Sequence, residues 1–124
     1  MIIETPISLG ELIDKISILL IKKKNVNNIE KQKYIKKELK LLEKTLHNTL
    51  GNKKNINQYL KKLILINTQL WKIEDKIREH ERQKKFDEQF IELARSVYIT
   101  NDNRAKIQNN INQKFGSRII EVKS

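Results

Sequence analysis

A stripe of six residues, apolar at its N-terminal end and polar at its C-terminal end, runs along a helix that the sequence predicts over residues 55–83. Its members are spaced by four, three, four, three and four positions and therefore share one helix face: Leu60, Ile64, Asn67, Trp71, Glu74 and Arg78. The stripe turns polar toward its C-terminal end, which suits a partly buried site for an anionic ligand. The structural alternative is that Glu74 and Arg78 form an i,i+4 ion pair beside a core Trp71. A buried Asn67 would then fix the helix register.

A second group of candidates lies where we expect one helix to end and another to begin. The expected junction is the Thr-Asn-Asp triplet at residues 100–102, any of which could cap the following helix. Free backbone amides at that N-terminus, close to two guanidinium groups, would suit a phosphate or a carboxylate. The group comprises Arg95, Tyr98, Asn101, Asp102 and Arg104. Capping and a first-turn acid explain part of it and leave Arg95 and Arg104 without a structural role.

Charged residues also interrupt the most apolar helix, which we expect to begin after Ser8. Ser8 and Glu11 match the Ser-x-x-Glu capping box, and Glu11 with Lys15 is an i,i+4 pair of the favourable orientation. Asp14 and Lys15, with Lys22 further along, then remain on a helix that is buried on most sides. We expect Asp14 and Lys15 either to face a charge on a partner helix or to line a wet pocket.

Most familiar catalytic and cofactor-binding patterns are absent from the sequence. The three glycines form neither a phosphate-binding loop nor a nucleophile elbow. Cysteine is absent, which excludes disulfides, a thiolate nucleophile and cysteine-based metal sites. His47 and His80 have no second histidine at helical spacing, and His80 is expected on a solvated helix face. We therefore expect no metal and no cofactor.

The elements that must position these residues are helices, so the predicted fold class is mainly α, in a single domain over residues 1–124. The first helix follows Ser8, the second spans residues 29–50 and the third spans residues 55–83. The second and third are expected to pack as a long antiparallel hairpin, closed by Gly51. Shorter helices are expected at residues 86–98 and from residue 103 to Gly116. Residues 2–7 could pair with residues 118–122 as a small two-stranded ribbon.

The net charge of +11 invites a nucleic-acid interpretation, because Lys and Arg neutralise phosphates. About ten of these charges lie in residues 22–62, away from the candidate residues. Tyr34 and Tyr59 are the only aromatic rings in that region, so base stacking would contribute little. Lys outnumbers Arg by 21 to 5, and Ile and Asn are also enriched, as AT-rich codon usage favours. Base composition alone could therefore account for the charge.

No exported or membrane-spanning segment is predicted. The first ten residues lack Lys and Arg and include Glu4 and Pro6, where a signal peptide needs a basic and then an apolar stretch. The longest apolar run, residues 16–21 with Ser17 inside it, is far shorter than the ~20 residues that cross a bilayer. Together with the absence of cysteine, these features favour a soluble protein of the cytoplasm without a membrane partner.

Several blocks of the sequence resemble an uncharacterised bacterial family labelled as a domain of unknown function. The blocks are residues 8–16 around Gly-Glu-Leu-Ile-Asp-Lys, residues 70–78 with Leu-Trp-Lys-Ile-Glu-Asp-Lys-Ile-Arg, and residues 86–105 with Leu-Ala-Arg-Ser-Val-Tyr and Thr-Asn-Asp-Asn-Arg-Ala. The likeness covers nearly the whole chain and is weak around residues 25–62. It implies a complete stand-alone member and an association with sugar-transferring enzymes, encoded beside them or fused to them. It implies no reaction. Because the polar candidates lie within these blocks and the basic region lies outside them, the resemblance favours a pocket over a nucleic-acid surface.

The leading hypothesis is a small helical binding or accessory module in which both chain ends fold onto the C-terminal half of the third helix. The ligand would be a small anionic molecule or peptide, most naturally a sugar phosphate or nucleotide-sugar. The predicted ligand-binding residues are Lys15, Asn67, Trp71, Glu74, Arg78, Arg95, Tyr98, Asn101 and Arg104.

Two alternatives stay open from the sequence. One is a small helical enzyme with an electrostatic pocket, in the general manner of an all-helical chorismate mutase, for which no catalytic residue is assigned. The other is nucleic-acid or protein binding through the basic region at residues 22–62. A homodimer is also compatible with the wide apolar faces of the helices.

Overall fold

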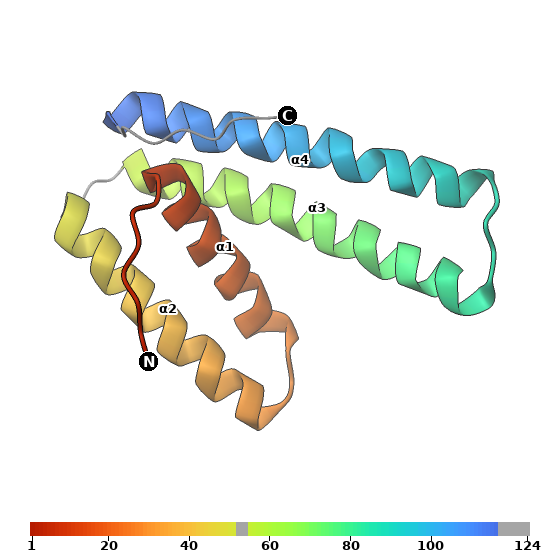
Figure 1. Ribbon diagram of the computed structural model, residues 1–124, viewed down its shortest axis with the longest axis horizontal. Coiled ribbons are helices and arrows are strands. Elements are labelled where there is room, and N and C mark those ends of the chain that lie inside the picture. The colour runs from red at the N-terminus through yellow and green to blue at the C-terminus, as the bar shows by residue number, and fades with distance from the viewer. Residues whose placement is uncertain (52–54, 117–124) are drawn as a thin grey trace.

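The computed structural model describes residues 1–51 and 55–116, and the regular elements of this part of the chain are four α-helices (Figure 1). They are α1 (Leu9–Asn25), α2 (Ile29–Leu50), α3 (Asn55–Gln83) and α4 (Glu88–Phe115). The pair α1–α2 and the longer pair α3–α4 are each antiparallel, and the two pairs diverge like the arms of a V. α1 lies between α2 and the α3–α4 pair. The predicted mainly α fold is confirmed.

The core is organised around α1, which is apolar on two sides. The helix begins at the predicted cap, where Ser8 Oγ accepts a hydrogen bond from the Glu11 amide at 3.1 Å. One side of α1 packs on α2 in a cluster of Leu12, Ile16, Leu19, Ile35 and Leu39. The other side packs on α3 and α4 in a cluster of Ile13, Ile56, Leu63, Ile66 and Ile111. Because full burial of one such side chain contributes about 1.5–3 kcal/mol, α1 links the two pairs strongly.

The predicted hairpin between the second and third helices is replaced by a different pairing. Within the described residues, α2 packs along α1, whereas α3 packs along α4 and α1. Only the C-terminal end of α2 comes near α3, where Leu46 and Leu50 reach the cluster that contains Ile56. The apolar faces predicted for α2 and α3 are buried, as Ile35 and Leu63 show. However, α1 packs on both faces. Periodicity shows which face of a helix is buried and not which helix covers it.

The predicted ribbon between the chain ends has no counterpart in the part of the chain that the structure describes. Residues 1–7 form no strand, and Met1, Ile2 and Ile3 are exposed. The expected partner segment, residues 118–122, lies outside the described residues.

One continuous helix, α4, replaces the two short helices predicted on either side of residues 100–102. It begins after Asp87, whose carboxylate accepts a hydrogen bond from the Phe90 amide at 3.0 Å. The two predicted segments are in phase, because the inward positions keep steps of three and four through Phe90, Leu93, Val97, Thr100, Arg104 and Ile107. Thr100 is buried in this seam, and no Gly or Pro interrupts the helix near it. Although α3 and α4 are long, none of the described helices is apolar enough to span a membrane.

The outer end of the α3–α4 pair projects beyond α1 and α2 (Figure 1). His80 lies there, with its side chain 14% exposed and its Nδ1 atom 2.9 Å from the Lys76 carbonyl oxygen. Its ring also lies beside Phe90 of α4, at 6.2 Å between centroids. His80 therefore packs between the two helices, and the prediction of a solvated helix face was wrong for this residue.

Candidate ligand pocket

A buried carboxylate, that of Asp14, joins three helices. The Asp14 side chain is 4% exposed. Its Oδ1 atom accepts a hydrogen bond from Asn67 Nδ2 of α3 at 2.7 Å, and its Oδ2 atom accepts one from Gln108 Nε2 of α4 at 2.8 Å. Arg104 of α4 adds an ion pair, with its Nε atom 3.1 Å from Oδ2. The buried charge is thus balanced by one cation and by two amide donors.

Ser17, one turn further along α1, adds to the polar side chains around Asp14. Together these side chains are called the polar layer. Its hydroxyl donates to the Asp14 carbonyl oxygen at 2.6 Å and accepts from Asn67 Nδ2 at 2.8 Å. The Asn67 amide therefore donates to two residues of α1. This contact holds α3 in one register against α1, in agreement with the structural role predicted for a buried Asn67.

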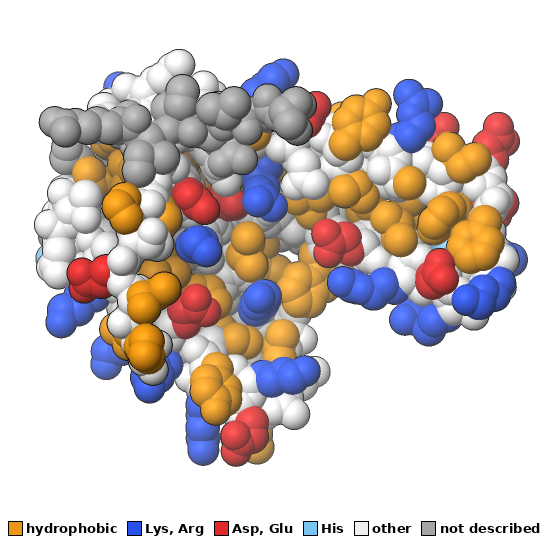
Figure 2. Space-filling model, viewed as in Figure 1, with side chains coloured by type: hydrophobic (Ala, Val, Ile, Leu, Met, Phe, Trp, Pro, Cys, Tyr) orange, Lys and Arg blue, Asp and Glu red, His pale blue; other side chains and the backbone are white. Residues whose placement is uncertain are grey.

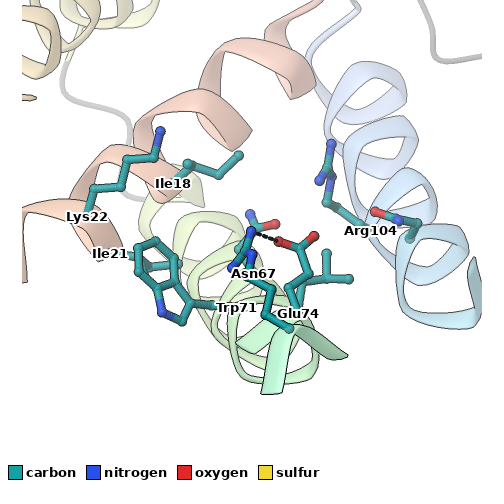
Figure 3. A pocket seen from close by; sticks show the side chains of 10 residues that line it. Ile18, Ile21, Lys22, Asn67, Trp71, Glu74 and Arg104 are labelled. Carbon is teal, nitrogen blue, oxygen red and sulfur yellow. Dashed lines mark ion pairs between the residues drawn. The ribbon is translucent and has the colours of Figure 1, made fainter. Parts of the chain in front are cut away.

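A pocket of about 370 Å³ opens beside this polar layer, between α1, α3 and α4 (Figure 3). Apolar side chains line part of it, namely Ile18 and Ile21 of α1 and Leu70 of α3. The other lining residues are polar, charged or aromatic: Lys22, Asn67, Trp71, Glu74, Arg78, Asn101 and Arg104. In Figure 3, Lys22 and Arg104 approach the pocket from opposite sides. The mixture of an apolar wall with a few convergent polar groups is typical of small-molecule sites.

The cationic side chains around the pocket differ in how firmly neighbouring carboxylates hold them. Arg104, which lines the pocket, is held through Nε by the buried Asp14. Arg78 faces Glu74 at 3.7 Å, the pair that Figure 3 marks with a dashed line, and Asp75 at 3.3 Å. Both Arg78 pairs are more than half exposed, so they are weak and can exchange for a ligand. Lys22 is exposed at the rim.

The structure brings six of the nine predicted ligand-binding residues to this one pocket: Asn67, Trp71, Glu74, Arg78, Asn101 and Arg104. Lys15 is exposed on α1 and does not line it, whereas Lys22, noted in the sequence without being assigned to the site, does. Arg95 and Tyr98 are exposed nearer the N-terminal end of α4 and do not line it either.

The anion site predicted at a helix N-terminus near residues 100–102 does not form. These residues lie inside α4, so their backbone amides are engaged in the helix and offer no free donors. Asn101 and Arg104 reach the pocket through their side chains only. Arg95 and Tyr98 entered the prediction through the supposed junction, and the continuous helix removes the reason for including them.

Three participants in the polar layer were missed in the sequence: Ser17, Gln108 and Asn112. Asn112 is fully buried, and its Oδ1 atom accepts a hydrogen bond from the Gly10 amide at 2.7 Å. A signal was available, because Thr100, Arg104, Gln108 and Asn112 recur every four residues on one face of α4. Four polar residues on the buried face of a helix indicate a polar contact with another element.

The polar layer is not optimised for stability alone. Gln108 Oε1 and Asn112 Nδ2 are buried and have no hydrogen-bond partner among the described residues. A buried polar atom without a partner costs about 1–3 kcal/mol, and a buried ion pair is often no better than apolar packing. A layer of this kind is more readily explained by a demand for fixed side-chain geometry than by a demand for stability.

Comparisons with known proteins give no identity for the chain. No family model, no curated protein and no solved structure matches it significantly. Within the described residues, no group of three or more His, Asp or Glu side chains could hold a metal ion.

Proposed function

We propose that the protein is a small binding or accessory module that takes an anionic small molecule in the pocket between α1, α3 and α4. The favoured ligand class is a sugar phosphate or nucleotide-sugar. One observation carries the proposal: cationic side chains from three different helices, Lys22, Arg78 and Arg104, line the same pocket as Trp71.

Arg104 is the most preorganised of the three cationic side chains for binding a phosphate. Its guanidinium is held by Asp14, so part of its side-chain entropy is already lost before a ligand arrives. The planar fork of an arginine can donate two parallel hydrogen bonds to phosphate oxygens. The buried Asp14 is thus a positioning residue, which orients Arg104 without facing the ligand itself.

Arg78 and Lys22 supply charge that can be redirected to a ligand. The long contact between Arg78 and Glu74 contributes little in the free protein because both groups are solvated. A phosphate entering the pocket can replace Glu74 as the partner of Arg78. The three cations are matched in number by their acidic neighbours Asp14, Glu74 and Asp75, so an anion is favoured by the release of Arg78 from its weak surface pairs and not by an excess of positive charge.

Trp71 gives the pocket an apolar face suited to a ring. Its side chain is half-buried, with Ile18, Ile21 and Leu70 also lining the pocket. An indole can stack on a nucleobase or cover the apolar face of a sugar ring. The volume of about 370 Å³ falls in the range of small-ligand pockets, about 300–1,000 Å³. A sugar phosphate is therefore a better match in size than a peptide.

Kinship with the bacterial family described above, and with it an association with sugar-transferring enzymes, remains part of this proposal. The family-like blocks contain Asp14, Trp71, Glu74, Arg78 and Arg104, the residues around which the pocket is built. The resemblance therefore points to the same place as the geometry.

Ligand-induced thermal stabilisation tests the proposal. We expect glucose 1-phosphate or UDP-glucose to raise the melting temperature of the wild type, because a ligand that binds only the folded state stabilises it by mass action. Glucose should not. The Arg78→Ala and Lys22→Ala variants should fold normally and lose most of the stabilisation.

Arg82→Ala is the matched control, since Arg82 pairs with Glu79 on the same helix, is as exposed as Arg78, and does not line the pocket. Stabilisation that is equal in the Arg78 and Arg82 variants, or that glucose produces as well, would contradict the proposal.

A further inference from the structure

Among the residues that the structure describes, Glu74 is the one acidic side chain that lines the pocket. Figure 3 shows it pointing into the pocket between Trp71 and Arg104. Its carboxylate lies 3.7 Å from the Arg78 guanidinium, which is close enough for an ion pair and too far for a hydrogen bond. The Glu74 side chain accepts no hydrogen bond from any described residue. It therefore presents its lone pairs to whatever enters the pocket.

A carboxylate in the pocket opposes the binding of a simple anion. When a ligand phosphate draws Arg78 away, Glu74 loses its counter-ion and faces a second negative charge. Like charges brought together in this way weaken binding. An ionised carboxylate can only accept hydrogen bonds, so the cost is offset when the ligand also brings donors. Hydroxyl groups beside the phosphate meet this requirement, and hydrogen bonds to a carboxylate are stronger than those between neutral groups.

The charge around the pocket does not select one phosphate compound over another. Acidic and basic side chains are interspersed on the α3–α4 pair on the face shown in Figure 2. The three pocket cations are also matched in number by Asp14, Glu74 and Asp75. A mixed field of this kind gives little long-range attraction for an anion. Discrimination must therefore come from contacts inside the pocket.

We infer that Glu74 is a specificity-determining residue, which accepts hydrogen bonds from sugar hydroxyls and so restricts the pocket to phosphate compounds that carry them. The inference rests on the proposed function, because it requires an anionic ligand in this pocket. Trp71 and Glu74 are three positions apart on α3 and both line the pocket. The indole covers the apolar face of a sugar ring, while the carboxylate binds hydroxyls at the edge of the ring. A ligand without hydroxyls leaves Glu74 unpaired and is rejected for that reason.

Isothermal titration calorimetry of the full chain with two phosphate esters tests the inference. Glucose 1-phosphate and cyclohexyl phosphate share a six-membered ring and a phosphate, but cyclohexyl phosphate has no hydroxyl group on its ring. We expect the wild type to bind glucose 1-phosphate at least ~10-fold more tightly, although cyclohexyl is the more apolar partner for Trp71. Glu74→Ala should reduce this preference to less than ~3-fold, because it removes both the hydroxyl acceptor and the charge that repels the other ester.

Asp75→Ala is the matched control. Asp75 lies 3.3 Å from Arg78 and its side chain is 59% exposed, against 52% for Glu74, but it does not line the pocket. Both variants therefore remove one carboxylate partner of Arg78, and only Glu74→Ala removes an acceptor from the pocket. Asp75→Ala should change the affinities for the two esters by the same factor and leave the preference unchanged. Circular dichroism should show that both variants keep the helical content of the wild type, since both side chains are exposed.

A wild type that binds the two esters equally, or that prefers cyclohexyl phosphate, would overturn the inference and leave the anion pocket in place. So would a preference that survives in Glu74→Ala, or one that Asp75→Ala lowers to the same extent. If neither ester binds at millimolar concentration, the proposed function fails and the inference fails with it.

Discussion

Asp14 of α1 and Arg104 of α4 form an ion pair, with 3.1 Å between Oδ2 and Nε, at the point where the polar layer meets the pocket. The carboxylate is buried and the guanidinium is one-third exposed. The pair therefore joins the core to the pocket. It connects the stability of the three-helix contact to the orientation of a pocket cation.

Replacement of Asp14 by Asn should destabilise the fold by about 2 kcal/mol. The change removes the charge that balances Arg104, and it presents an amide donor to the amides of Asn67 and Gln108. Breaking a fully buried pair costs more, but here Arg104 can turn partly to solvent. Urea unfolding measures the effect, with Glu79→Gln as the control. Glu79 pairs with Arg82 on the surface, and the hydrogen bond from Arg82 lowers the pKa of Glu79. If both variants lost equal stability, the buried pair would have no special structural role.

Gly10→Ala should destabilise the protein by about 2–3 kcal/mol. A Cβ atom at Gly10 would lie 2.4 Å from the backbone carbonyl oxygen of Gln108, so α1 and α4 would have to separate. The separation would also strain the hydrogen bond from the Gly10 amide to Asn112. Thermal unfolding gives the size of the effect. Without this close approach, alanine would stabilise the helix by about 1 kcal/mol, and that result would contradict the packing of α1 on α4.

The continuity of α4 predicts opposite responses at two candidate caps. Asp87→Ala should cost about 1 kcal/mol, because the Asp87 carboxylate caps the helix through the Phe90 amide. Asn101→Ala should be neutral or stabilising by about 0.5 kcal/mol, because Asn101 is exposed inside the helix and alanine has the higher helix propensity. Chemical denaturation of the two variants distinguishes the cases. A loss of about 1 kcal/mol for Asn101→Ala would instead indicate a helix N-terminus at residues 100–102.

Local structure was largely predictable from the sequence. The bounds of α2 and α3 and the Ser8 cap of α1 agree with the structure, because apolar periodicity and capping are local properties. The grouping of Asn67, Trp71, Glu74 and Arg78 in one pocket also follows from their shared helix face.

Pairing of the helices was not predictable in the same way. The seam of α2 could be covered by α3 or by α1, and only the two-sided apolar surface of α1 decides between them. Residues 100–102 resemble a helix cap in composition, yet Thr100 is a seam position of one long helix. The misplaced junction then brought Arg95 and Tyr98 into the predicted site. The misplaced junction and the two wrongly included residues share one cause, since a short polar run has the same local chemistry at a helix end and at a buried polar contact.

Titration of the fluorescence of Trp71 tests the proposed pocket most directly, because Trp71 is the only tryptophan in the chain and lines that pocket. We predict a saturable change in its emission on addition of glucose 1-phosphate or UDP-glucose, no change with glucose, and loss of the change in Arg78→Ala but not in Arg82→Ala. Emission that does not respond to either phosphate compound, or that responds identically in the two variants, would contradict the account.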